Sequence, residues 1–213
     1  MSLKFLTMPI VAVITADIVN STRLKKAEEK LLISNLSSIL KSYKFEFYRG
    51  DSFQAYIPDP KQALKVVLQA RAAAKRLSSG FSSPFTDVRA SIGIGNITAP
   101  VKELNTAKGE AFLLSGRGFD EMSKTGKRLK IQSANDVINL GLKIIANYAD
   151  SLFARLTSKQ AAVVFELLMD HNQIETAKRL KKSQPTINKH AQSARCIEIN
   201  NLIADYQLFI NQL

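Results

Sequence analysis

Hydrophobic and polar positions over residues 10–132 follow two periods, one typical of strands and the other typical of helices. Short runs rich in β-branched and aromatic residues predict strands at 11–15, 45–48, 53–57, 87–97 and 128–132. Apolar residues three and four positions apart predict helices at 26–43, 62–77 and about 109–124. The inner faces of the first two helices are expected to hold Leu31, Leu32, Leu36, Ile39 and Leu40, and Ala63, Val66, Val67, Ala70 and Ala74.

The order of these elements, β-α-β-β-α-β with additions, is that of the ferredoxin-like plan. In that plan an antiparallel sheet is covered by helices on one face. We therefore expect an α+β fold in which residues 1–133 form a ferredoxin-like domain.

The pattern changes after Ser133, where helical periodicity is almost continuous. Residues 134–152 are expected to form a linking helix, and residues 153–213 an all-α domain whose first helix is capped by Thr157 or Ser158. The last helix, 197–213, carries an apolar stripe that is either domain core, the default expectation, or a dimer seam. The stripe consists of Ile199, Leu202, Ile203, Tyr206 and Ile210.

Residues 173–194, QIETAKRLKKSQPTINKHAQSA, have the pattern of a helix-turn-helix DNA-binding domain. Ala177 is small enough for two helices to cross, and Ile187 falls ten residues later, facing inward. The turn covers residues 181–183, where Ser183 is placed to cap the second helix and Pro185 lies in its first turn. Lys181 occupies the turn position where glycine is usual, so it must adopt an unfavourable backbone geometry or a different turn.

The exposed side of the second helix would carry side chains that both donate and accept hydrogen bonds. Such residue types read base edges in the major groove of double-stranded DNA. These are Gln184, Thr186, Asn188, Lys189 and Gln192, while Lys178, Lys182 and Arg195 are expected to contact phosphates. The alternative is a helical hairpin used only for packing or dimerisation.

Charge agrees with a polyanionic partner, since the formal net charge is +12 and the pI is near 9.8. Residues 1–150 carry 22 basic and 13 acidic residues (+9), and residues 151–213 carry 8 and 5 (+3), so the excess is not concentrated in the C-terminal part. It is local instead, because residues 178–195 hold six Lys and Arg and no acid. A solvated basic helix face is the other interpretation of this stretch.

The single cysteine, Cys196, excludes an internal disulfide and is typical of a reducing compartment. His171 and His190 are too isolated to indicate a zinc site. The N-terminal run MSLKFLTMPIVAVITADI has the basic and apolar parts of a signal peptide, but Pro9 interrupts it and no convincing cleavage site follows. No apolar run approaches the ~18 residues that cross a bilayer. We therefore expect a cytoplasmic protein without membrane contact.

Two aspartates are expected to meet at one edge of the sheet. Asp17 directly follows the first predicted strand, and Asp51 lies with Gly50 at the tip of the hairpin between residues 48 and 53. Paired carboxylates suit Mg²⁺ or Mn²⁺ held together with nucleotide phosphates. Taken alone, Asp17 is also explained as a helix cap, and the Gly50-Asp51 pair as ordinary turn chemistry.

The runs ADIVNST, YRGDSFQAYI, RASIGIG and GEAFLLSGR resemble motifs of class III nucleotidyl cyclases over residues 10–132. The resemblance implies that Asp17 and Asp51 are metal ligands, that the Ile18 carbonyl is a further contact, and that Arg117 is a transition-state arginine. Phe47 and Leu113 replace the family's base-selecting lysine and its asparagine, so base and ribose recognition are expected to be lost. Across nearly the whole chain the motifs, followed by a helix-turn-helix, resemble the SatD-like bacterial proteins.

These patterns favour a transcriptional regulator, binding DNA as a homodimer, whose degenerate cyclase-like domain senses a nucleotide or a metal ion. The alternative function is an active nucleotidyl cyclase or related metal-dependent nucleotide enzyme with a DNA-binding appendage. A scaffold without ligand is a third possibility, but it explains neither aspartate.

Overall fold

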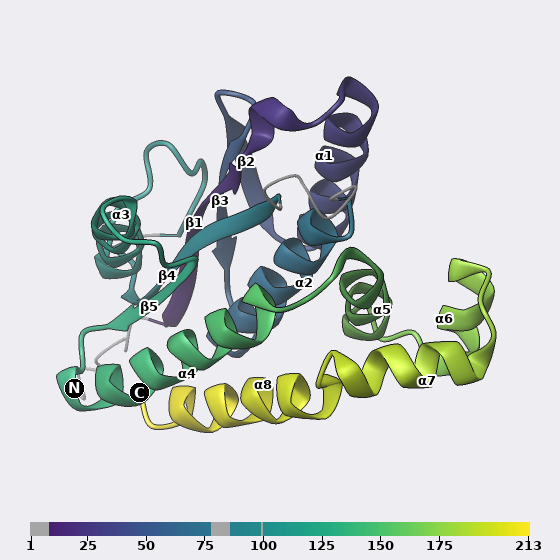
Figure 1. Ribbon diagram of the computed structural model, residues 1–213. Coiled ribbons are helices and arrows are strands. Elements are labelled where there is room, and N and C mark those ends of the chain that lie inside the picture. Colours follow the sequence, from purple (N-terminus) through teal and green to yellow (C-terminus); the bar gives the residue numbers. More distant parts are fainter. Residues whose placement is uncertain (1–8, 78–85, 99) are drawn as a thin grey trace, which may run out of the picture.

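The fold is described from a computed structural model over residues 9–77, 86–98 and 100–213. Within these ranges the chain forms a five-stranded sheet, of order β2-β3-β1-β4-β5, and eight α-helices (Figure 1). The strands are β1 (Ile10–Val19), β2 (Lys44–Tyr48), β3 (Ser52–Ile57), β4 (Asp87–Asn96) and β5 (Leu129–Ser133). Residues 1–8, the start of the run tested above as a signal peptide, lie outside the described residues.

The sheet follows the predicted ferredoxin-like order for its first four strands, because β1 pairs antiparallel with both β3 and β4, and β2 with β3. The additional strand β5 departs from the antiparallel plan, since it pairs parallel with β4. The reason is the connection between them, because a helical crossover returns the chain in the same direction as the strand it left.

Helices cover both faces of the sheet, so the expectation that they cover one face is wrong. Figure 1 shows α3 (Glu110–Ser123) on one side, and α1 (Lys26–Leu40) and α2 (Ala63–Lys75) on the other. Alternate residues of β1 serve the two sides: Ile14 packs in the cluster with α1 and α2, whereas Val13 packs in the cluster with Ala111 of α3. Short 3₁₀ turns, η1 (Ser21–Arg23) and η2 (Pro60–Gln62), follow β1 and precede α2.

The predicted inner faces of the first two helices are buried, with one exception. Leu31 is exposed, whereas its neighbour Leu32 is fully buried. Helix α2 is buried almost all round because it lies between the sheet, α1 and a helix of the C-terminal part. A fully surrounded helix does not display a single inner stripe, and so the sequence pattern defined only part of its buried surface.

The C-terminal part consists of α4 (Asp136–Ala154), α5 (Ser158–Leu168), α6 (Gln173–Leu180), α7 (Gln184–Ser193) and α8 (Cys196–Ile210). Helix α4 packs on β5 and beside α8, and α5 packs on α2 (Figure 1). The five predicted apolar positions of α8 are all buried as domain core. Tyr206, one of them, donates a hydrogen bond from its hydroxyl to the Pro60 carbonyl at 2.8 Å. One hydrophobic cluster therefore runs from the sheet into α5 and α8.

None of the helices in the described ranges combines the length and hydropathy needed to cross a membrane.

Candidate functional site

Asp17 lies inside β1, not after it as the sequence pattern predicted, because β1 continues to Val19. The antiparallel register pairs it with Arg89 of β4. The Arg89 guanidinium donates to both carboxylate oxygens, at 3.1 Å from Nε and 2.5 Å from Nη2. It also lies 5.0 Å from the ring centroid of Phe119 on α3. The Asp17 carboxylate is thus paired in a fork-shaped ion pair on the α3 side of the sheet.

Asp51 lies at the tip of the β2–β3 hairpin, where Arg49 (φ 52°) and Gly50 (φ +85°) both adopt positive φ. The Asp51 carbonyl accepts a hydrogen bond from the Ile18 amide at 2.8 Å. Its carboxylate accepts from the Ser21 hydroxyl at 3.0 Å and the Ser52 hydroxyl at 3.4 Å. The backbones that carry the two aspartates therefore meet as predicted, while their carboxylates are bonded to different partners.

Asp17 and Asp51 could bind a metal ion only if a further molecule, such as a nucleotide, supplied additional oxygen ligands. Among the described residues no three His, Cys, Asp or Glu side chains are grouped closely enough to hold an ion. Mg²⁺ commonly uses one or two carboxylates plus phosphate oxygens, which is a ligand set that Asp17, Asp51 and a nucleotide would supply. Because Arg89 occupies both oxygens of Asp17, metal binding there requires the guanidinium to move aside.

A cavity of about 420 Å³ opens on the α3 side next to these residues. Its walls come from β1, β2, β3, α3 and residues 104–107, and include Ala16, Ser52, Phe112 and Phe119. On its floor, the Thr15 hydroxyl accepts from the Gln54 amide at 3.3 Å and donates to the Ser115 hydroxyl at 3.1 Å. The mixture of aromatic walls and a few polar groups is typical of a small-molecule site.

The remaining cyclase-like positions lie apart from this cavity. Arg117 is exposed on α3 and does not line the cavity. Phe47 packs against the rings of Phe45 and Phe53, each with a centroid 5.8 Å away, and Leu113 is exposed. The structure thus gives Phe47 a packing role in an aromatic cluster.

Helices α6 and α7 are joined by the short turn that the sequence predicted. Lys181 ends α6 in the left-handed conformation (φ 52°, ψ 49°), and Ser183 caps α7 by accepting from the Thr186 amide. Ala177 and Ile187 face each other across the turn and are buried with Val163 of α5. The three helices α5, α6 and α7 therefore share a small core of their own.

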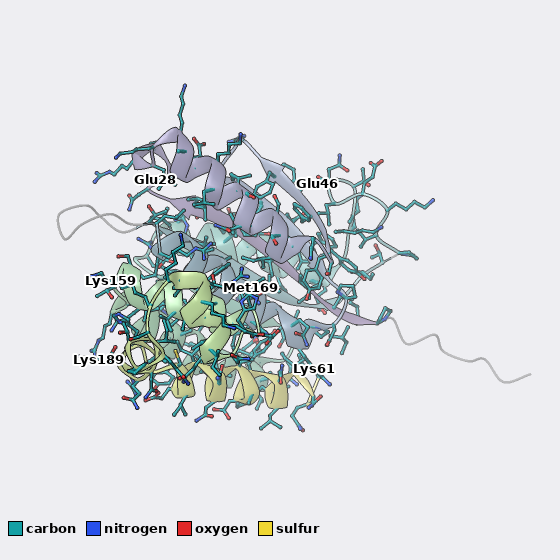
Figure 2. All side chains as sticks on the ribbon, turned by 90° about the vertical axis from the view of Figure 1, so that its right-hand side faces the viewer. Glu28, Glu46, Lys61, Lys159, Met169 and Lys189 are labelled. Atoms are coloured by element: carbon teal, nitrogen blue, oxygen red, sulfur yellow. The ribbon has the colours of Figure 1, made fainter. Side chains whose placement is uncertain are left out.

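The predicted DNA-contacting residues of α6 and α7 are mostly at the surface. Thr186 is half-buried, with its hydroxyl 2.8 Å from that of Ser183. Lys159, at the start of α5, is also exposed, and Figure 2 shows it on the same side of the molecule as Lys189. The exposed residues of the predicted set, apart from Arg195, are Lys178, Lys182, Gln184, Asn188, Lys189 and Gln192.

Arg195 and Arg179 are both held by acids in the structure. The Arg195 guanidinium donates to Glu198 at 2.8 Å and to the Tyr148 hydroxyl at 3.0 Å, so a phosphate would compete with this pair. Arg179 donates to the buried Glu166 at 2.5 Å, and Arg76 of α2 donates to the same carboxylate at 3.3 Å. Glu166 therefore ties α6 to α2, and Arg179 has a structural role.

Replacing Lys181 with glycine is expected to stabilise the protein, because a residue with a side chain in the left-handed region costs about 1–2 kcal/mol that glycine avoids. Part of this stabilisation is lost again, since glycine has greater conformational freedom in the unfolded chain. We expect a net increase of about 0.5–1 kcal/mol in the free energy of unfolding by chemical denaturation. Lys182→Gly, one position further along the turn, is the matched control and should not stabilise. A loss of stability in Lys181→Gly would contradict the turn geometry.

No protein-family model and no curated protein matches the sequence. Solved nucleotidyl cyclase domains match part of it. The guanylyl cyclase domain of a fusion protein from the aquatic fungus Blastocladiella emersonii is 19% identical, over 53% of this chain and 74% of that one, with a TM-score of 0.40. A bacterial light-regulated adenylyl cyclase is 15% identical, over 58% and 76%, with a TM-score of 0.41. The catalytic core of a rhodopsin-guanylyl cyclase in complex with ATPαS is 18% identical, over 53% and 72%, with a TM-score of 0.38. The resemblance to SatD-like proteins stays a prediction.

Proposed function

We propose that this chain is a DNA-binding regulator that reads the major groove with α7 and takes a nucleotide, with Mg²⁺ or Mn²⁺, beside Asp17 and Asp51. The observation that carries the proposal is the surface of α7. Its inward side, Ile187 and Ala191, is buried against α5 and α6, while its outward side presents Asn188, Lys189 and Gln192 to solvent. An α-helix with its side chains is ~10–12 Å across and fits the major groove, which is ~12 Å wide, and the ten residues of α7 extend ~15 Å.

The flanking cations support the same orientation. Lys178 near the end of α6 and Lys182 in the turn are exposed and adjoin the start of α7. Lysines in such positions contact phosphates on either side of the groove and hold the register of the reading helix. Arg179, by contrast, belongs to the Glu166 cluster and is left out of the proposed interface.

Packed elements connect the two proposed sites. Helix α3 lies on β5, β5 on α4, and α4 on α8, and α8 follows α7 after two residues. A ligand that shifts α3 therefore acts on elements in continuous contact with the DNA-reading helix. Regulation on this route requires two arrangements of these elements with different affinities for DNA.

The DNA proposal is tested by the salt dependence of binding to duplexes selected from a randomised pool. Lys182→Ala is expected to weaken binding to all sequences alike and to reduce the slope of log K against log salt by ~0.9, the value of one phosphate contact. Asn188→Ala should instead cost ~10–100-fold on the selected sequence, with a smaller effect on random DNA.

The matched control is Lys30→Ala, which removes the same charge from an exposed position on α1. It should leave both affinity and slope unchanged. Equal losses in Lys30→Ala and Lys182→Ala would mean that only the net charge of the chain matters. No selected duplex at all would overturn the proposal.

A metal-dependent nucleotide enzyme is the second candidate, favoured by Asp17 in β1 and Asp51 in the neighbouring β2–β3 turn, both beside the cavity. For the regulator, ATP or GTP with Mn²⁺ should raise the melting temperature without being consumed, and Asp51→Asn should abolish the shift. Asp120→Asn, an exposed acid on α3, is the control. Product formation from any nucleoside triphosphate that is lost in both Asp17→Asn and Asp51→Asn would establish the enzyme instead.

A further inference from the structure

Helix α4 has two apolar stripes, and only one of them is covered. The covered stripe packs on the sheet and on α8, and includes Leu142, Ala149 and Phe153. The other stripe is open to solvent, with exposed fractions of 78% for Val137, 67% for Leu140 and 69% for Ile144. A helix that is apolar around most of its circumference is typical of one surrounded by protein on all sides.

Helix α8 extends this open surface. Leu208 is 63% exposed, and Phe209 lies over Gly141 of α4, where a β-carbon would come within 2.4 Å of its ring. Glycine at position 141 thus lets the Phe209 ring lie directly on α4. Between the two helices is a shallow apolar cavity of about 270 Å³. We refer to this surface as the α4–α8 face, and it consists of Val137, Leu140, Gly141, Ile144, Tyr148, Leu208 and Phe209.

The α4–α8 face is large enough for a stable protein contact. Six of its side chains are large, and together they expose on the order of 600 Å² of mainly apolar surface, taking ~150–200 Å² for each fully exposed side chain. A typical stable interface buries ~800 Å² per partner, of which ~60% is apolar. The exposed apolar area therefore matches what one side of such an interface needs.

Charge identifies the partner that suits this face. Of the charged side chains on α4 and α8, Asp150 is paired with the buried Arg71 and Glu198 with Arg195. The exposed Asp136, Lys143 and Asp205 remain, which gives 1 − 2 = −1 on a chain of +12. A second copy of a strongly basic chain is repelled by most of the surface. The α4–α8 face is nearly neutral, and Arg195, beside Tyr148 at its edge, is paired with Glu198, so two copies meet here with little repulsion.

We propose that a second copy of the chain packs on the α4–α8 face across a two-fold axis, forming a homodimer. In a two-fold dimer the same surface of both copies is used, so a single interface removes Leu140, Ile144 and Leu208 of both copies from solvent. The seam lies on the outward stripe of α4, whereas the buried stripe of α8 remains domain core. Because α7 precedes α8 directly, the same contact holds two α7 helices in one assembly.

The dimer is tested by sedimentation velocity on the full chain over a concentration series. We expect a dimer in the wild type and a ~30-fold or larger rise in its dissociation constant for Leu140→Lys and for Leu208→Lys, as for central interface residues. Leu113→Lys, at a 51% exposed leucine on α3, is the matched control and should remain dimeric. Circular dichroism and thermal melting separate loss of the dimer from loss of the fold.

A cross-link locates the seam independently. Burial raises the pKa of the Cys196 thiol to about 11, and the negative charge of the nearby Glu198 contributes a smaller part of this rise. The thiol therefore stays protonated and reacts slowly at pH 7. Ile144→Cys with a short bifunctional maleimide should therefore give a covalent dimer, and Leu113→Cys should give none. A wild type that is monomeric at all concentrations would overturn the proposal, as would a dimer that both lysine substitutions leave intact. Neither result bears on whether single copies bind DNA, which the salt-slope experiment measures separately.

Discussion

Replacing Arg71 with leucine is expected to lower the free energy of unfolding by about 3–5 kcal/mol, a large part of the 5–15 kcal/mol that holds a typical domain folded. Arg71 is fully buried, and its guanidinium joins three elements. It donates to Asp87 at the start of β4 at 3.1 and 2.9 Å, and to Asp150 of α4 at 2.7 Å. The central carbon of the Arg71 guanidinium, Cζ, also lies 4.9 Å from the ring centroid of Phe153.

The loss is large because the two carboxylates would lose the guanidinium that is hydrogen-bonded to both of them. Burial by itself lowers the pKa of Arg71, but the carboxylates of Asp87 and then Asp150 outweigh it, and the pKa is raised. Asp150 is held further by the amides of Arg128 and Leu129, at 3.0 and 3.3 Å, so it cannot turn away to solvent without breaking them. The guanidinium is therefore stabilised as a cation, and its removal is costly.

The measurement is urea denaturation of Arg71→Leu, Asp87→Asn with Asp150→Asn, and the triple variant. If the buried charges cause the loss, the triple variant should be more stable than Arg71→Leu alone, because no uncompensated carboxylate is left. Lys30→Leu, at an exposed position on α1, is the control for loss of a cation and should change stability by less than ~0.5 kcal/mol. Strict additivity of the separate effects would contradict this account.

Substituting Gly93 with alanine should cost about 3 kcal/mol, at the upper end of the range for overpacking. Gly93 lies in β4 beneath α3, and an added β-carbon would lie 2.2 Å from the Ala111 carbonyl oxygen and 2.3 Å from the Ser115 nitrogen. Both are backbone atoms, so no side chain can rotate to make room. Helix α3 would have to move off the sheet, which also changes the cavity that Phe112 and Phe119 line.

The control is a glycine of α3, the helix that packs over Gly93. Gly116 has no atom within 4 Å of an added β-carbon, so Gly116→Ala should raise stability by about 0.5–1 kcal/mol through helix propensity. We expect Gly93→Ala to shift the denaturation midpoint down and to lose any nucleotide-induced stabilisation, while Gly116→Ala keeps it. Equal stability of the two variants would show that α3 adapts without cost.

Local patterns predicted the elements because each one is specified by neighbouring residues. The β2–β3 hairpin, the Thr157 and Ser183 caps and Pro185 in the first turn of α7 all lie where expected. These features depend on contacts within a few residues, which the order of side chains records directly. Strand ends were less well predicted: β1 runs on through Asp17 to Val19 because β3 pairs with it as far as Asp17 and β4 as far as Val19.

The candidate site was predictable in position but not in its partners. Asp17 and Asp51 were found from their places beside a strand and in a turn. Arg89, which forms the ion pair with Asp17, lies 72 residues further along the chain, and only the antiparallel register of β1 and β4 places it opposite Asp17. Nothing in the local sequence distinguishes this arginine from the many others on a basic chain. The same holds for Arg179, which belongs to the basic stretch by sequence but to Glu166 by contact.

The sequence by itself determined which segments become helices and strands, where α6 turns into α7, and that Ala177 and Ile187 face inward, because periodicity and capping act over short separations. Only the tertiary structure decided that α3 covers the opposite face of the sheet, that Arg71 joins Asp87 to Asp150, and that α4 keeps an apolar stripe in solvent. Those outcomes depend on which distant segments pack together, and a residue's neighbours in sequence do not contain that information.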